Sequence, residues 1–405
     1  MKHEKEINYL IELVKCAVTD NIPSIPEKDI DWEFIYKLSK LHKILSTVYF
    51  GISKLPKEIV SNIPHIDNYT LAYKKNLVLD ANKTFELTRI KEQLGNHHVD
   101  YVLLKGSVIK YIYPDTSMRR MGDIDILFRN ANEVTIDEIF SSLGYTLRNK
   151  LAKDSSYFNP TTQTYVEMQE TLIDYGFTEW FYYLKDIWGR CVTSPDSPGE
   201  YIMTNEDFYI YHIIHMAKHF KNGGIGITHV LDVYIMWQKY NLDYNYINLE
   251  LEKIGLVKFH NVVKNIVNYW FNGEIKDLNS HTKNSLCQDI NHSLSPDETD
   301  LIAKYILRNG AFGKKKQQET NAIVKRGDSK VSLRKKIFPE METMVNYYGA
   351  FLDRHKYLLP FYWLRLNFER LFLRSTRSRQ SLSNMSAITE ENISDTRDVM
   401  KICGL

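Results

Sequence analysis

Two short motifs within residues 103–128 have residues that could bind a phosphate group or the metal ion that accompanies it. Gly106 and Ser107 follow the apolar run YVLLK, and Asp123 and Asp125 lie in the alternating run DIDILF. Residues two apart on an extended strand point to the same face, with Cα atoms about 7 Å apart, so the two carboxylates are expected to point together. Two like charges at that spacing favour a bound cation. Oxygen ligands suit Mg²⁺, which keeps its other positions for water and phosphate oxygens.

Each motif also has a simpler interpretation. Backbone N–H groups and the dipole at a helix start can cradle a phosphate, but Gly106 and Ser107 are equally explained as ordinary turn residues. The Asp pair is alternatively a solvated strand edge. The sequence DIDILFRN lacks the Asp ladder, central Gly and terminal Glu of a calcium-binding EF-hand loop, which argues against that kind of site.

The elements around these motifs change character along the chain. Apolar residues recur at helical spacing as far as Leu94, and residues 100–128 then predict strand, helix and strand. The run ANEVTIDEIFSSLGY predicts a helix closed by Gly144, and YFNPTTQTYVEM predicts a hairpin. Helical spacing returns after Tyr201, where Thr204 is expected to cap the next helix.

We therefore expect a predominantly helical α+β fold, in which a small mixed β-sheet core stands between N-terminal and C-terminal helical units. The expected boundaries are residues 1–97 for the N-terminal helical unit, 98–200 for the sheet core, 201–310 for a second helical unit and 311–405 for a basic linker, an amphipathic helix and a tail.

The last of these regions begins with a basic stretch. Residues 314–336 hold nine Lys or Arg against two acidic residues and sustain no apolar periodicity, which predicts a linker or loop. The amphipathic run LLPFYWLRLNFERLFLR follows, and a loosely packed tail is expected beyond Ser375. The basic stretch and the aromatic residues after it could form a groove for RNA or another polyanion, but a solvated loop and a buried helix explain them equally well.

Composition sets limits on the class of protein. The 405 residues are 43% hydrophobic and 25% charged with a formal charge of +2, which is ordinary for a globular chain and imposes no global attraction to nucleic acid or membrane. The four cysteines show no zinc-like or disulfide spacing. The first residues lack the apolar run of a signal peptide, and no apolar run is long enough to span a membrane. We expect a cytoplasmic protein without membrane insertion.

The stretch LLKGSVIKYIYPDTSMRRMGDIDILF resembles the polymerase-beta-like nucleotidyltransferase superfamily, in which an apolar-Gly-Ser helix start precedes a strand bearing Asp-x-Asp. With HIIHMAKHF, GIGITHVLDVYIMW and LLPFYWLR, the chain looks more narrowly like the bacterial uncharacterised nucleotidyltransferase family with helical extensions. The resemblance implies that Gly106 and Ser107 hold the triphosphate of an NTP. It also implies that Asp123 and Asp125 coordinate Mg²⁺ or Mn²⁺.

A third metal ligand is implied by the same resemblance, because relatives carry another carboxylate on a later strand. Glu167 in TYVEMQE is the best match, and Glu170 is expected to face the other way. Relatives tend to read Val-Asp-Leu-His here, so Glu167 and Gln169 depart from the pattern. Glu167 is expected to share the metal and to accept the proton of the acceptor.

Basic residues near the motifs are candidates for phosphate contacts. Arg119 and Arg120 precede the Asp pair and could bind phosphate or acceptor bidentately, or they could simply face solvent. Lys105 ends a strand and could reach a phosphate, or it could extend its ammonium into water.

Three histidines, His212, His215 and His219, lie at helical spacings on one side of a predicted helix. Met216 stands where a zinc protease of the HExxH type needs Glu, which argues against that chemistry. The histidines either pack between helices or contact phosphate and acceptor, and we expect His215 and His219 to have the second role. Asp232 is expected to be a hydrogen-bonded packing residue.

The expected reaction is transfer of NMP from an NTP to an unknown acceptor, with release of pyrophosphate. The acceptor could be a small molecule, a peptide, a protein or an RNA. Two alternatives remain open: a metal-dependent glycosyltransferase, which also uses Asp-x-Asp to hold a sugar nucleotide, and a nucleotide-binding or RNA-binding module that has lost turnover.

Overall fold

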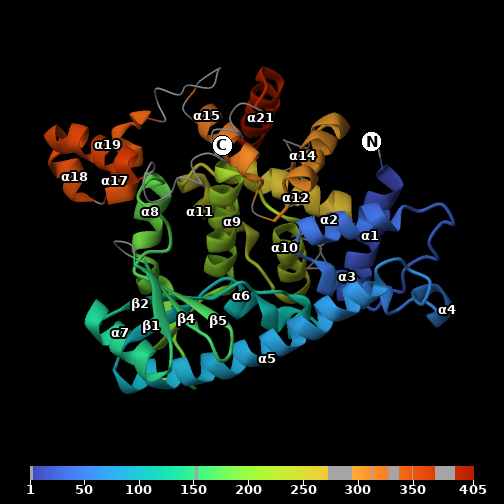
Figure 1. Ribbon diagram of the computed structural model, residues 1–405, viewed down its shortest axis with the longest axis horizontal. Helices are drawn as coiled ribbons and strands as arrows, with labels where there is room; N and C mark the ends of the chain where they lie inside the picture. The colour runs from blue at the N-terminus through green and yellow to red at the C-terminus, as the bar shows by residue number, and fades with distance from the viewer. Residues whose placement is uncertain are drawn as a thin grey trace.

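The computed structural model describes residues 3–150, 154–271, 294–311, 313–325, 327, 337–348, 350–369 and 388–405. The chain begins with helices that pack side by side before one long helix leads to the sheet (Figure 1): α1 (Glu4–Val18), α2 (Trp32–Leu41), α3 (Leu45–Ile52), α4 (Lys57–Val60) and α5 (Ile66–Asn96). Gly51 lets α3 approach α1 closely, because a Cβ at that position would lie 2.2 Å from the carbonyl oxygen of Leu13.

A seven-stranded mixed sheet follows, with strand order β3-β4-β5-β2-β1-β7-β6. Its strands are β1 (Asp100–Leu103), β2 (Ile124–Arg129), β3 (Thr146–Lys150), β4 (Asp154–Asn159), β5 (Thr164–Gln169), β6 (Cys191–Thr193) and β7 (Glu200–Met203). β2 runs parallel to β5, and β1 runs parallel to β7, while the remaining neighbours are antiparallel. The hairpin expected over residues 157–168 is confirmed as the β4–β5 pair.

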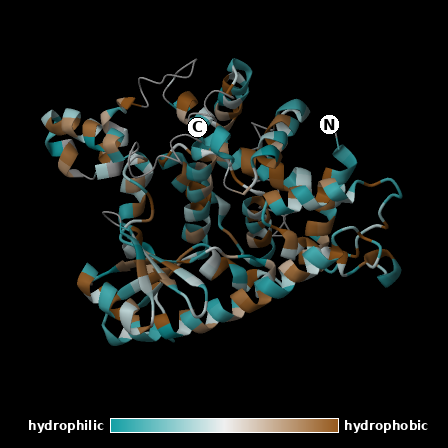
Figure 2. Cartoon of the chain, viewed as in Figure 1, coloured by the Kyte–Doolittle hydropathy of each residue, from teal (hydrophilic) through white to brown (hydrophobic). Residues whose placement is uncertain are grey.

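The two faces of the central strand β2 enter different cores. Ile124, Ile126 and Phe128 pack with α5 and with α7 (Glu133–Ser142), which lie on one side of the sheet (Figure 1). Leu127 packs instead into the core that contains the C-terminal helices. Side chains alternate along a strand, so Asp125 shares the face of Leu127 and points toward those helices. Figure 2 shows hydrophobic and hydrophilic residues mixed along α5, as expected of a helix with one face on the sheet and the other in water.

The C-terminal half is helical and packs above the sheet in Figure 1. Its helices are α9 (Asn205–Asn222), α10 (Ile227–Lys239), α11 (Tyr244–Lys253), α12 (Val257–Phe271), α14 (Pro296–Asn309), α15 (Lys315–Lys325), α17 (Met341–Tyr348), α18 (Ala350–Arg354), α19 (Leu359–Phe368) and α21 (Glu390–Cys403). Two short helices, α6 (Gly106–Ile109) and α8 (Thr178–Lys185), connect strands of the sheet. Buried residues of α1–α3 and of α9, α10, α12 and α14 form one continuous hydrophobic core.

These observations confirm a predominantly helical α+β fold, and Thr204 caps α9 through a bond to the backbone N–H of Asp207 (3.1 Å). In the part of the chain that the structure describes, no helix combines the length and the apolar character needed to cross a bilayer.

The C-terminal region differs from expectation in two places. Residues 315–325, expected as a linker, form α15, whose buried face is partly polar: the Gln317 amide donates to Asn321 Oδ1 (2.7 Å) and to Thr396 Oγ1 (2.9 Å). Because polar side chains anchor this helix, its sequence has no apolar periodicity from which a helix could be predicted. The tail beyond Ser375 includes α21, which buries Ile393 and Val399 against the rest of the protein. The rest of the basic stretch, at 326 and 328–336, and residues 370–387 of the expected amphipathic segment and tail lie outside the described residues.

Candidate active site

Three carboxylates meet on the face of the sheet that looks toward the C-terminal helices. Asp125 on β2 lies directly opposite Glu167 on the parallel strand β5, and Asp123 precedes Asp125 by two residues. Side chains of directly paired residues project from the same face. One oxygen from each of the three carboxylates lies within 4.8 Å of the other two.

Two neighbouring side chains fix the Asp125 carboxylate. Lys105 Nζ donates to Asp125 Oδ1 at 2.6 Å, and Gln169 Nε2 donates to the same oxygen at 3.0 Å. Lys105 itself has a left-handed backbone (φ 48°), a conformation that non-glycine residues adopt rarely. The backbone N–H of the preceding residue, Leu104, donates to the Asp125 carbonyl (3.1 Å). The chain at the end of β1 is therefore hydrogen-bonded to the residue that carries the central carboxylate.

The electrostatics of the cluster favour a bound cation. Burial and the neighbouring Asp125 charge raise the pKa of Glu167 to about 7, and the same two causes raise the pKa of Asp123. Burial works against the charge of Lys105, but Asp125 outweighs it and raises the pKa of this ammonium. Among the described residues, Lys105 is the cation that hydrogen-bonds to one of the three carboxylates, and the raised pKa values of Asp123 and Glu167 reflect crowded negative charge. An all-oxygen donor set of this kind suits a hard cation such as Mg²⁺ or Mn²⁺.

Gly106 and Ser107 begin the short helix α6, directly after Lys105, whose ammonium binds Asp125. A Cβ on Gly106 would come within 2.8 Å of Met121 Cγ, so only glycine allows Met121 to pack there. Ser107 is 1% exposed, and its Oγ has no hydrogen-bond partner among the described residues. A buried hydroxyl without a partner costs free energy, and a phosphate oxygen is a group that would satisfy it.

The two arginines before the Asp pair have different positions. Arg119 forms a bidentate ion pair with Asp232 of α10, with Nε 2.8 Å from Oδ1 and Nη2 2.9 Å from Oδ2. Tyr113 donates to the same carboxylate at 2.6 Å. Asp232 is therefore the hydrogen-bonded residue that the sequence suggested, and Arg119 is engaged by it. Arg120 is exposed next to Asp123.

The histidines gather on α9. His215 Nε2 and His219 Nε2 lie 3.1 Å apart, which fits a hydrogen bond between two neutral imidazoles. Burial, followed by the charge of Lys105, lowers the pKa of His215 well below its usual value, and burial with Lys218 and Lys105 lowers that of His219 to about 4. His212 is buried deeper in the helical packing, and its Nε2 has no partner among the described residues. The charge on Lys105 thus reaches His215 and His219, which lie on the helical side of the candidate site.

Sequence reasoning missed three side chains near the carboxylates. Gln169 orients Asp125, as described above. Lys83 on α5 donates to the Met121 carbonyl at 2.6 Å, and the charge of Asp123 acts on both Lys83 and Lys43. The lysines gave no signal because both lie in the N-terminal helical region, where a lysine reads as a solvated surface residue.

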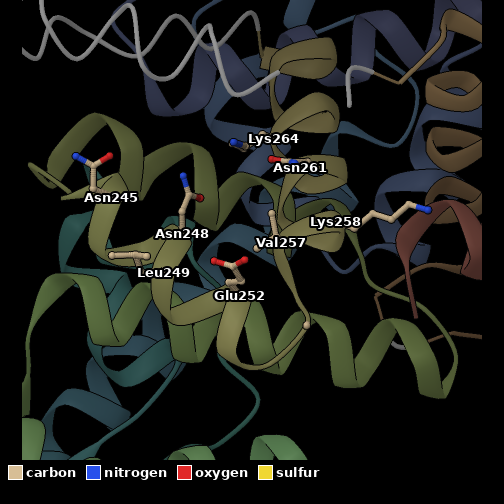
Figure 3. Close-up of a pocket in the computed structure, with 9 residues that line it drawn as sticks. Asn245, Asn248, Leu249, Glu252, Val257, Lys258, Asn261 and Lys264 are labelled. Atoms are coloured by element: carbon tan, nitrogen blue, oxygen red, sulfur yellow. The ribbon is translucent and has the colours of Figure 1, made fainter. Parts of the chain in front are cut away.

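A separate groove of about 640 Å³ lies between α11 and α12 (Figure 3). The figure shows Asn245, Asn248 and Glu252 on one wall, with Asn261 and Lys264 on the other. None of the predicted site residues lines this groove.

Comparison with known proteins agrees with the geometry. No curated protein and no solved structure matches the chain. Residues 28–272 match a family described as uncharacterised nucleotidyltransferase, and this match covers more than half of the chain, from α2 through α12. The resemblance drawn from the Gly-Ser and Asp-x-Asp motifs is confirmed, and the protein belongs to the uncharacterised nucleotidyltransferase family.

Proposed function

We propose that the protein is a metal-dependent enzyme that transfers NMP from an NTP to an acceptor and releases pyrophosphate. The observation that carries the proposal is the convergence of Asp123, Asp125 and Glu167 within 4.8 Å. The Ser107 hydroxyl, which is buried and has no partner among the described residues, supports it. Membership of a nucleotidyltransferase family supports a nucleotide as substrate.

The carboxylates have the role of holding Mg²⁺ or Mn²⁺, which when bound would neutralise charge developing on the phosphates. Lys105 and Gln169 hold the Asp125 side chain so that it need not reorient during the reaction. Gly106 lets the chain pass close to Met121 as it enters α6, and Ser107 donates its hydroxyl to a phosphate.

In the transfer step, an oxygen of the acceptor forms a bond to the α-phosphorus while the bond to the bridging oxygen of the β-phosphate breaks. Pyrophosphate leaves with that bonding electron pair. Glu167 takes the proton from the acceptor hydroxyl. His215 and His219 lie on the helical side of the carboxylates and are proposed to contact the acceptor as neutral hydrogen-bonding groups.

The test is incubation of the pure protein with each α-labelled NTP, Mg²⁺ or Mn²⁺ and cell extract. We expect label to appear on an acceptor together with pyrophosphate. The double variant Asp123→Asn with Asp125→Asn should lose the transfer, whereas Glu170→Gln, which removes a neighbouring carboxylate beyond the end of β5, should retain it. Turnover of a sugar nucleotide without use of any NTP would instead identify a glycosyltransferase, and metal-dependent NTP binding without product would identify a module that has lost turnover.

A further inference from the structure

Three cations from outside the sheet lie in the region of Asp123, and two of them, Lys43 and Lys83, interact with its charge. Lys83 comes from the long helix α5, Lys43 from the turn between α2 and α3, and Arg120 from the loop before β2. The charges of Asp123 and Arg120 both act on each of the two lysines. Lys105 is not part of this set, because its ammonium is bound to Asp125.

Lys83 is buried without a matching charge in hydrogen-bonding contact. It is 5% exposed, and the hydrogen bond that the structure describes for its ammonium goes to the neutral carbonyl of Met121. An ammonium has three N–H groups, and burying its charge costs several kcal/mol unless partners compensate it. A side chain that served packing alone would be more stable as an apolar residue. The carboxylates of Asp123 and Asp80 act on this ammonium by charge, and a bound anion would add a hydrogen-bonding partner for its remaining N–H groups.

The place of Lys83 links it to the expected phosphate turn. Met121, which accepts the Lys83 hydrogen bond, is the residue that packs over Gly106. The carbonyl that holds the ammonium thus belongs to the segment that runs on to Asp123. Lys83 on α5 and Gly106 at the start of α6 therefore contact the same residue, Met121.

Lys43 and Arg120 add positive charge at the surface, near the buried Lys83. Both are exposed, whereas Asp125 is buried; Asp123 reaches solvent, although neighbouring protein crowds its carboxylate. Partial burial and the charge of Arg120 lower the pKa of Lys43, while Asp123 raises it. The open side of the carboxylate cluster thus has a cationic border.

We propose that Lys83, with Lys43 and Arg120 at the rim, binds the β- and γ-phosphates of the NTP. This inference rests on the proposed function and adds the side chains that receive the leaving pyrophosphate. A triphosphate is repelled by three carboxylates, so cations on the open side supply compensating charge and direct the tail away from Glu167. Charge-assisted hydrogen bonds to phosphate are among the stronger polar contacts in proteins.

The test measures binding of inorganic tripolyphosphate, pyrophosphate and phosphate in the presence of Mg²⁺ by calorimetry, so that base preference plays no part. We expect Lys83→Gln to weaken tripolyphosphate binding about tenfold and Lys43→Gln about threefold, with smaller losses for single phosphate. Lys83→Arg should retain most of the affinity. Lys57→Gln, which removes an exposed lysine of α4, is the control and should bind like wild type.

Equal tripolyphosphate affinity in wild type, Lys43→Gln and a folded Lys83→Gln would overturn the inference. If Lys83→Gln fails to fold, the tripolyphosphate affinities of Lys43→Gln and Lys83→Arg decide whether the inference holds. A protein that transfers NMP and loses this activity in the Asp123/Asp125 double variant, yet shows no loss with either lysine variant, refutes only the inference. A wild-type protein that binds neither NTP nor tripolyphosphate refutes the proposed function as well.

Discussion

Replacing Asp232 by Ala should be among the most damaging single changes near the site. The Asp232 carboxylate is completely buried and accepts hydrogen bonds from Arg119 and from Tyr113. Arg119 is 15% exposed, so Asp232→Ala leaves a largely buried guanidinium without its counter-charge. Removing one partner of a buried ion pair costs about 3–5 kcal/mol, and we expect the free energy of unfolding to fall by that amount in urea titrations.

The matched control is Asp100→Ala, which also removes the partner of an arginine. The Arg129–Asp100 pair has Nε 2.9 Å from Oδ2, but its side chains are 37% and 19% exposed. Water compensates both groups there, so the loss should stay near 0–1 kcal/mol. Equal losses in the two variants would refute the reasoning that burial makes the Asp232 pair costly. Because Arg119 also donates to the Arg120 carbonyl (2.7 Å), Asp232→Ala should in addition weaken binding of Mn²⁺ at the carboxylates.

Three further outcomes are expected. Burial lowers the pKa of His42 to about 4, so the unfolded chain binds a proton before the folded chain does as the pH falls. From this group, the free energy of unfolding should drop by roughly 3 kcal/mol between pH 6.5 and 4. Urea titrations of His42→Gln should show a correspondingly shallower dependence of that free energy on pH. Gly106→Ala should lower the free energy of unfolding by about 1–3 kcal/mol, because its Cβ clashes with Met121. Adding Met121→Ala should restore part of that free energy in the same titration, and no recovery would argue against the clash. Gln317→Leu should destabilise by about 2 kcal/mol because it leaves buried polar neighbours unsatisfied, whereas Gln318→Leu on the exposed side of α15 should change thermal stability little.

The position of the carboxylates was accessible from the sequence because it depends on short-range patterns. Period-two alternation in DIDILF predicted which residues share a face, and the hairpin predicted over residues 157–168 placed Glu167 on a strand with the same alternation. The pairing of β2 with another strand depends on residues far apart in the sequence, so no local pattern predicts it. The structure supplies it as the parallel β2–β5 pairing.

The remaining features depend on contacts between distant residues. Lys83 lies 38 residues before the carbonyl that it binds, and Gln317 lies 79 residues before Thr396. A lysine on an amphipathic helix and a glutamine in a basic stretch both look solvated in the sequence. Their burial follows only from how α5, α15 and α21 pack, so neither the cationic border nor the polar face of α15 could be predicted.

The most direct measurement of the central claim is Mn²⁺ binding by electron paramagnetic resonance without any nucleotide. We expect wild type to bind Mn²⁺ and the variants Asp123→Asn, Asp125→Asn and Glu167→Gln each to weaken it about tenfold or more. The control Glu170→Gln should leave the affinity unchanged. Unaltered Mn²⁺ affinity in the three variants would show that these carboxylates do not hold the metal and would contradict the account.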